Sequence, residues 1–194
     1  MSDNQERIAK VIARSGLASR REAERMVTEG RVTVNGSIAH HPGQPVDEES
    51  DHIEVDGKIL PAPSPHVYYL LNKPKGVVCT NEPRECRQRA VDLVNDKAKG
   101  RIYTVGRLDE ESEGLILLTN DGDFAHRVMH PSFGIEKSYR VKLRGQLQGD
   151  ALDRVRAGVQ LAEGKTGGAR VTVRRAHVEK GKEVTHRMLP HKCN

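Results

Sequence analysis

Four acidic residues and one basic residue lie within seven positions of the sequence: Arg107, Asp109, Glu110, Glu111 and Glu113. Three arrangements suit these residue types: a solvated loop with an Arg107–Asp109 ion pair, a metal site of oxygen ligands, or one carboxylate acting as nucleophile or base. The metal site is the weakest, because no His or further Asp stands at an obvious ligand spacing. A carboxylate that a neighbouring cation keeps ionised can attack an electrophilic carbon without a metal. The residues alone leave the alternatives open.

The segments on either side of this acidic loop are predicted to hold it in place. Tyr103 and Val105 alternate as on a strand that Gly106 ends, and residues 115–118 form a short apolar strand closed by a turn at 120–122. A loop held between two strands can aim its side chains at a fixed point.

A basic turn follows a predicted strand in residues 67–76. Pro74 and Gly76 end the strand, because neither residue suits its continuation. We expect Lys73 and Lys75, at the end of this strand, to be exposed.

Another alternating strand is predicted over residues 137–143. Tyr139 shares one face with Val141 and Leu143. Its ring is either a core aromatic or a platform that stacks on a base extruded from RNA.

Residues 60–66 contain three prolines in seven positions, which is typical of an extended linker. The chain then divides into a module at 1–60, a linker at 61–66 and a larger region at 67–194. The module contains 8 Lys and Arg against 11 Asp and Glu, whereas the rest of the chain contains 24 against 16. This basic excess is compatible with a polyanionic partner, although the charge alone does not establish one.

The N-terminal module is predicted to begin with two helices. Apolar spacing indicates a helix over 7–14, and Ser19 followed by Glu22 forms a capping box for the second helix. Residues 31–36 predict a strand that ends in an Asn-Gly turn. Three basic residues of the second helix form either a solvated surface or a grip for phosphate groups: Arg20, Arg21 and Arg25.

Composition excludes several classes of protein. No apolar run approaches the roughly 18 residues of a membrane-spanning helix, and no apolar signal segment follows the first residues. Three cysteines are an odd number without zinc-ligand spacing, which suits a reducing compartment. We expect a cytoplasmic protein, and exclude a membrane protein, a disulfide scaffold and a long disordered chain.

The N-terminal module resembles the S4 RNA-binding domain in Ser19-Arg-Arg-Glu-Ala-Glu24 and Gly30-Arg-Val-Thr-Val-Asn-Gly36. The resemblance covers about residues 5–60 and implies a small αL-type domain that binds structured RNA by shape. It favours the phosphate grip over the solvated surface. The residues implied to contact RNA are Ser19, Arg20, Arg21, Arg25, Arg31 and Asn35.

The remaining motifs resemble those of the pseudouridine synthases. Gly106-Arg-Leu-Asp109, followed by residues 114–122, resembles the signature of this family. Residues 71–76 are similar to the first motif of the family, and Lys137-Ser-Tyr139 is similar to its second motif. The S4 resemblance and His130-Pro-Ser132 point to the branch that modifies uridines in ribosomal RNA. Within it, the large-subunit (23S) enzymes are most similar.

This resemblance implies chemical roles. Asp109 attacks the target nucleoside, the bond between ribose C1′ and uracil N1 breaks, and C5 of the turned base joins C1′. Arg107 helps to open the stack or orients Asp109, and Tyr139 packs on the flipped uracil and helps to deprotonate C5. Lys137 and Lys73 are expected to contact RNA. No metal, nucleotide or redox cofactor is implied.

The implied fold is α+β, with the S4 domain followed by a mixed, largely antiparallel sheet and flanking helices. The implied enzyme is a monomer, and its implied partner is ribosomal RNA or a ribosome assembly intermediate.

The C-terminal residues depart from the family pattern. Relatives carry a basic helical motif after a strand like that at 169–175, and residues 183–194 do not resemble this motif. Residues 190–194 show no helix or strand pattern. We therefore expect an incomplete catalytic region with an unpaired sheet edge. A catalytically inactive S4-type RNA-binding protein is the alternative function.

Overall fold

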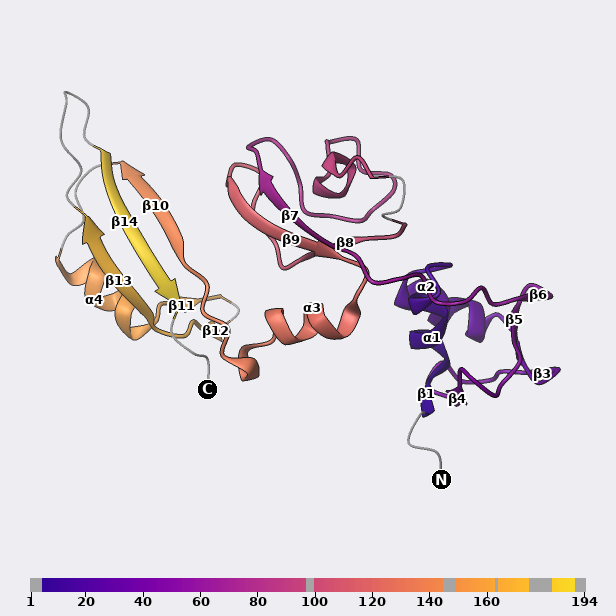
Figure 1. The fold of residues 1–194 in the computed structure, drawn as a ribbon. Coiled ribbons are helices and arrows are strands. Elements are labelled where there is room, and N and C mark those ends of the chain that lie inside the picture. The colour runs from indigo at the N-terminus through magenta and orange to yellow at the C-terminus, as the bar shows by residue number, and fades with distance from the viewer. Residues whose placement is uncertain (1–4, 97–99, 145–148, 163, 175–182, 191–194) are drawn as a thin grey trace. The chain divides into compact units, whose positions relative to one another are not determined.

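A computed structural model describes residues 5–96, 100–144, 149–162, 164–174 and 183–190 (Figure 1). The chain divides into two compact units, residues 1–126 and 127–194. The first unit contains two separate hydrophobic cores. None of the helices in the described ranges combines the length and the apolar character needed to cross a membrane.

The first unit begins with the helices α1 (Ile8–Arg14) and α2 (Arg20–Thr28). The Ser19 hydroxyl accepts a hydrogen bond from the Glu22 amide, which confirms the predicted cap of α2. Gly30 follows α2 at a φ of 71°, a left-handed conformation that ends a helix at little cost.

Short antiparallel strands complete this module. One sheet has the order β3 (Ser37–Ile38), β2 (Val32–Val34), β5 (Ile53–Val55) and β6 (Lys58–Ile59), while β1 (Gln5–Arg7) pairs with β4 (Pro45–Asp47). The turns Asn35-Gly36 and Asp56-Gly57 have positive φ at both residues, as type I′ hairpin turns require. The buried core includes residues of both helices and of the strands: Ile8, Val11, Ile12, Val27, Val32, Val46 and Val55.

The second core of this unit lies against a three-stranded antiparallel sheet, ordered β7 (Tyr68–Lys73), β9 (Gly114–Thr119) and β8 (Tyr103–Val105). The 3-10 helix η1 (Ala90–Leu93) contributes Val91 to the same core. Lys73 at the end of β7 pairs with Gly114 at the start of β9. The loop between β8 and β9 therefore leaves the sheet beside the end of β7.

Helix α3 (Gly122–Met129) follows β9, and its first turn is capped by Asp121. The carboxylate oxygen Oδ1 of Asp121 accepts hydrogen bonds from the amides of Asp123 (3.0 Å) and Phe124 (2.9 Å). Two amide groups that helix geometry leaves without partners are thereby satisfied.

The second unit contains a sheet of β10 (Tyr139–Arg144), β14 (Glu183–Pro190) and β13 (Ala169–Arg174), in that order. Its other elements are the 3-10 helix η3 (Pro131–Phe133), helix α4 (Gly149–Ala157) and the hairpin β11 (Gln160–Leu161) with β12 (Gly164–Lys165).

Strand β14 corrects the expectation that Pro190 shows no strand pattern. It lies between two partners, with Met188 opposite both Tyr139 and Val171. Pairing on both sides imposes the extended conformation, which the local sequence does not indicate. Residues 191–194, the rest of the expected patternless tail, lie outside the described residues.

The expected α+β class is confirmed. All pairings between the strands named above are antiparallel, and an isolated parallel bridge joins Val78 to Arg89. Short connections account for the pairings β2–β3, β5–β6 and β8–β9 in the first unit, because antiparallel strands need little chain between them.

The core of the N-terminal module can be tested by truncating one isoleucine. We expect Ile12→Ala to lower the free energy of unfolding by about 2–5 kcal/mol, because Ile12 is fully buried and its loss leaves a cavity. Urea denaturation followed by circular dichroism measures the change. Ile59→Ala is the matched control, since Ile59 is 67% exposed, and it should change stability by no more than about 0.5 kcal/mol. Equal losses would contradict the assigned core.

Candidate active site

The loop between β8 and β9, residues 106–113, presents Asp109 to solvent. Asp109 and Arg107 are exposed, whereas Leu108 between them packs against the second core. Gly106 begins the loop at a φ of 84°, where a side chain would cause strain. The Asp109 carbonyl accepts a hydrogen bond from the Ser112 amide (3.0 Å), which turns the chain back toward β9. We call these residues the Asp109 loop.

Both neighbours of Asp109 are fixed to other parts of the unit. The amide of the preceding residue donates a hydrogen bond to Cys79 Sγ (3.4 Å). The carbonyl of Glu110 accepts hydrogen bonds from the Gly76 amide (2.9 Å) and from Lys73 Nζ (3.2 Å). An exposed carboxylate between two fixed residues has a defined position, yet its oxygens stay accessible to a ligand.

Lys73 lies beneath the Asp109 loop, so the expectation that it is exposed is wrong. Its side chain is 0% exposed, and Nζ donates to the carbonyl oxygens of Pro74 (2.9 Å), Val77 (2.7 Å) and Glu110 (3.2 Å). These acceptors replace the water that burial removes from the ammonium group. Lys73 therefore joins a turn to the Asp109 loop, and its charge is not available for the predicted RNA contact. Lys75, two residues later, is exposed.

Arg87 fixes the side chain of Glu110. One guanidinium nitrogen lies 2.8 Å from Glu110 Oε2, while the others donate to both carboxylate oxygens of Glu85. These hydrogen bonds, together with the Arg87 amide, lower the pKa of Glu85 to about 2. Glu85 and Arg87 are both charged at neutral pH, and the contact with Arg87 limits the motion of the residue that follows Asp109.

No ion pair joins Arg107 to Asp109, although one interpretation of the sequence required it. Within the described ranges, neither side chain has a hydrogen-bond or ion-pair partner. Both groups are therefore accessible to a substrate. Among the described residues, no group of three or more His, Cys, Asp or Glu is arranged to hold a metal ion.

Tyr139 and Lys137 belong to the second unit. Tyr139 begins β10 and its side chain is 43% exposed, so it is not a buried core aromatic in this unit. Lys137 Nζ donates a hydrogen bond to the Val128 carbonyl (3.0 Å), which ties the approach to β10 to the last turn of α3. The predicted RNA contact of Lys137 stays a prediction.

The basic residues of α2 fall into two groups. Arg20 and Arg21 are exposed, and their side chains have no hydrogen-bond or ion-pair partner in the part of the chain that the structure describes. Arg25 pairs with Glu22 (2.5 Å) and Glu29 (3.5 Å) on the same helix. Exposed pairs of this kind contribute little stability, so Arg25 can exchange a carboxylate for a phosphate at small cost.

Arg31 and Asn35 stabilise the two ends of β2. The Arg31 guanidinium binds both oxygens of Asp56 (2.8 and 2.6 Å) and lowers the pKa of that carboxyl. The Asn35 side chain donates to Asp51 Oδ1 and accepts from the His52 amide, both at 2.8 Å. Both residues thus support the fold, and their RNA contacts stay predictions.

The supports of the Asp109 loop were not predicted from the sequence. A signal existed for Lys73, because it shares the strand parity of Tyr69 and Leu71, which pack against the core. Cys79 and Arg87 contact residues 29 and 23 positions away. Their roles therefore depend on long-range folding that a local pattern does not reveal.

Two sequence families match this chain. Residues 67–189 match the family described as RNA pseudouridylate synthase, and residues 6–53 match the S4 domain. Both resemblances drawn from the motifs are thereby confirmed.

Individual relatives are also similar. The chain is 43% identical over 165 residues to "Ribosomal large subunit pseudouridine synthase B" of Bacillus subtilis, covering 85% of this chain and 66% of the relative. It is 42% identical over 163 residues to the protein of that name from Pseudomonas aeruginosa, covering 82% and 42%. A crystal structure of a pseudouridylate synthase superposes with a TM-score of 0.57 at 26% identity, covering 94% of this chain and 76% of that one. The chain spans less than two thirds of the length of these two curated relatives.

Replacing the buried ammonium tests the support of the Asp109 loop. We expect Lys73→Met to lower the free energy of unfolding by about 2–3 kcal/mol, because the buried Val77 carbonyl and the part-buried Pro74 carbonyl lose a charged donor. Urea denaturation measures the loss. Lys75→Met makes the same chemical change in the exposed lysine of the same turn and should cost less than about 0.5 kcal/mol. Equal stabilities of the two variants would show that the ammonium does not support the loop.

The Glu85–Arg87 pair predicts a pH dependence. Because the folded-state pKa of Glu85 is about 2 against an ordinary 4.5, the pair contributes stability above pH 4.5 and loses it as pH falls toward 2. A carbon-13 NMR titration should place Glu85 near 2 in the wild type and near its ordinary value in Arg87→Gln. Arg84→Gln, which removes a neighbouring charge, should leave the Glu85 titration unchanged. An ordinary pKa in the wild type would refute the pairing.

Proposed function

This chain belongs to the RNA pseudouridylate synthase family, and we propose that it isomerises uridine to pseudouridine in ribosomal RNA. The observation that carries the proposal is the exposed Asp109 carboxylate, held between two fixed residues on the Asp109 loop. A carboxylate in this setting is a nucleophile that needs no conformational search before it reacts.

The proposed reaction exchanges one bond for another within the nucleoside. Asp109 attacks the nucleoside, the bond between C1′ and N1 breaks, and the free uracil turns. A bond then forms between C5 and C1′, the C5 proton leaves to solvent, and N1 gains a proton. The carboxylate is released unchanged, so no oxidant, reductant or group donor enters the balance.

Other residues are proposed to act around Asp109. The exposed Arg107, which lacks a partner among the described residues, orients the RNA or opens its stack. Tyr139, exposed at the start of β10, packs on the flipped base and assists removal of the C5 proton. Both assignments follow the family motif at these positions.

The S4 module is proposed to hold the RNA. Arg20 and Arg21 supply unpaired guanidinium groups for phosphate contacts. The names of the relatives favour large-subunit ribosomal RNA as the substrate, free or within an assembly intermediate. We further propose that the protein acts as a monomer in the cytoplasm.

Tritium release from RNA labelled at C5 of uridine tests the proposal. We expect release by the wild type in the presence of EDTA, and a loss of more than about 1,000-fold in Asp109→Asn, because the nucleophile is removed. Glu111→Gln is the matched control, since Glu111 is an exposed acid of the same loop. Equal rates for Asp109→Asn and the wild type would remove Asp109 from the mechanism. RNA binding without release by the wild type would support an inactive binding protein instead.

A further inference from the structure

Three hollows in the first unit form a series in which each hollow shares lining residues with the next, and we call this series the trough. The S4 hollow, of about 350 Å³, is lined in part by Arg7, Lys10 and Arg20. Lys10 and Arg20 also line the junction cavity, of about 390 Å³, whose other wall includes Arg101 and Tyr103. Arg101 in turn lines a third hollow of about 250 Å³. The trough therefore runs from α1 and α2 to the segment before β8.

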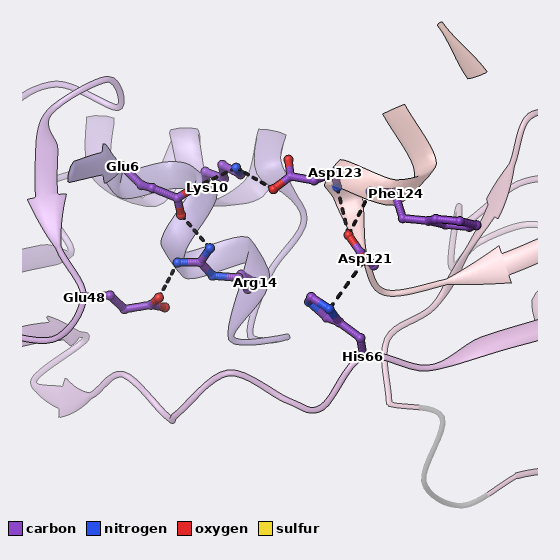
Figure 2. A network of polar contacts seen from close by, with 8 residues as sticks. All are labelled: Glu6, Lys10, Arg14, Glu48, His66, Asp121, Asp123 and Phe124. Carbon is purple, nitrogen blue, oxygen red and sulfur yellow. Dashed lines mark hydrogen bonds and ion pairs between the residues drawn. The ribbon is translucent and has the colours of Figure 1, made fainter. Parts of the chain in front are cut away.

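Several charged groups along this trough already have partners (Figure 2). Arg14 binds Glu6 and Glu48. Lys10 lies 2.8 Å from a Glu6 oxygen and 3.0 Å from Asp123 Oδ2. The ion pair with Asp123 joins α1 to the first turn of α3. In this pair the positive charge of Lys10 is offset by the negative charge of Asp123.

The second acid of the junction cavity is also engaged. Asp121 Oδ1 is used in capping α3, and Oδ2 accepts a hydrogen bond from the Tyr68 hydroxyl (2.7 Å). His66 Nδ1 lies 3.4 Å from the same Oδ2 atom. Both carboxylates on this wall therefore have donors that offset their repulsion of an incoming anion.

Three arginines of the trough have no such partner. Arg7, Arg20 and Arg101 are exposed, and their side chains form no hydrogen bond or ion pair within the described ranges. Each hollow contains at least one of them. Tyr103 adds an uncharged donor, because burial, together with the charge of Asp121, raises its pKa to about 12 and the phenol keeps its proton.

We propose that the junction cavity binds one phosphate of the RNA backbone between Arg20 and Arg101, while the trough receives the adjoining nucleotides. This inference rests on the proposed function, since the ligand is the same RNA. A volume of 390 Å³ lies within the roughly 300–1,000 Å³ of ligand-binding pockets. Guanidinium groups bind phosphate oxygens through paired, charge-assisted hydrogen bonds. The substrate itself then links the S4 module to the catalytic sheet.

Filter binding to a transcript of the complete large-subunit ribosomal RNA tests this contact. Every protein carries Asp109→Asn, so no turnover occurs during the measurement. We expect Arg20→Ala and Arg101→Ala each to weaken binding about 10-fold, as loss of a charge-assisted contact predicts. The slope of log affinity against log salt reports how many phosphates the protein neutralises. Because Arg20 and Arg101 are proposed to hold the same phosphate, the double variant should reduce the magnitude of this slope by about 0.7–0.9, the value for one phosphate and not for two.

Arg84→Ala is the charge-matched control, because Arg84 is exposed in the same region but lines none of these hollows. It should bind with about the affinity of the parent protein. Unchanged circular dichroism spectra show that the variants fold. Binding by the double variant that equals binding by Arg84→Ala overturns the proposal.

Two further measurements separate this proposal from its alternatives. If inorganic phosphate raises the Tm of the parent protein but not of the double variant, while both bind RNA equally, the cavity takes a free anion and the RNA contact is refuted. If the wild type releases no tritium but both arginine variants lose RNA affinity, the isomerase proposal fails and the RNA contact is supported.

Discussion

The position of the Asp109 loop depends on one buried ammonium group at the end of β7. Lys73 Nζ donates to three carbonyl oxygens and has no exposure to water. Taking such an ion out of water costs several kcal/mol unless polar groups compensate it. One of the compensating carbonyls belongs to Glu110, the residue after Asp109. The ion that stabilises a turn therefore also sets the position of the proposed nucleophile.

The distribution of ion pairs separates supporting residues from residues accessible to a ligand. Arg31 and Arg87 each bind both oxygens of a carboxylate and support a strand end or the Asp109 loop. Arg20, Arg101 and Arg107 are exposed and unpaired within the described ranges. An exposed guanidinium without a carboxylate can neutralise a phosphate without first breaking a contact. These free guanidinium groups explain how the proposed RNA binding is compatible with first sixty residues that carry more acids than bases.

Elements with strong local signals were predicted well. The cap at Ser19 and the Asn-Gly turn at residues 35–36 depend on neighbours in sequence. Helix α4 and strand β14 were not predicted. Strand β14 pairs along both sides with segments far from it in sequence, so its conformation is decided by those partners. Lys73 is buried against the prediction, because it lies on the same face of β7 as Tyr69 and Leu71, and backbone carbonyl groups replace water around its charge.

The sequence by itself determined the chemistry that the chain can offer: a carboxylate at Asp109 beside an arginine, in a loop between two strands, with an S4 domain ahead of it. It also determined the helix caps and turns, because these depend on side chains a few residues apart. Only the tertiary structure decided that Lys73 is buried, that Arg87 holds Glu110 and that Arg101 shares a cavity with Arg20. Burial and charge pairing arise between groups far apart in the chain, and folding alone brings them together.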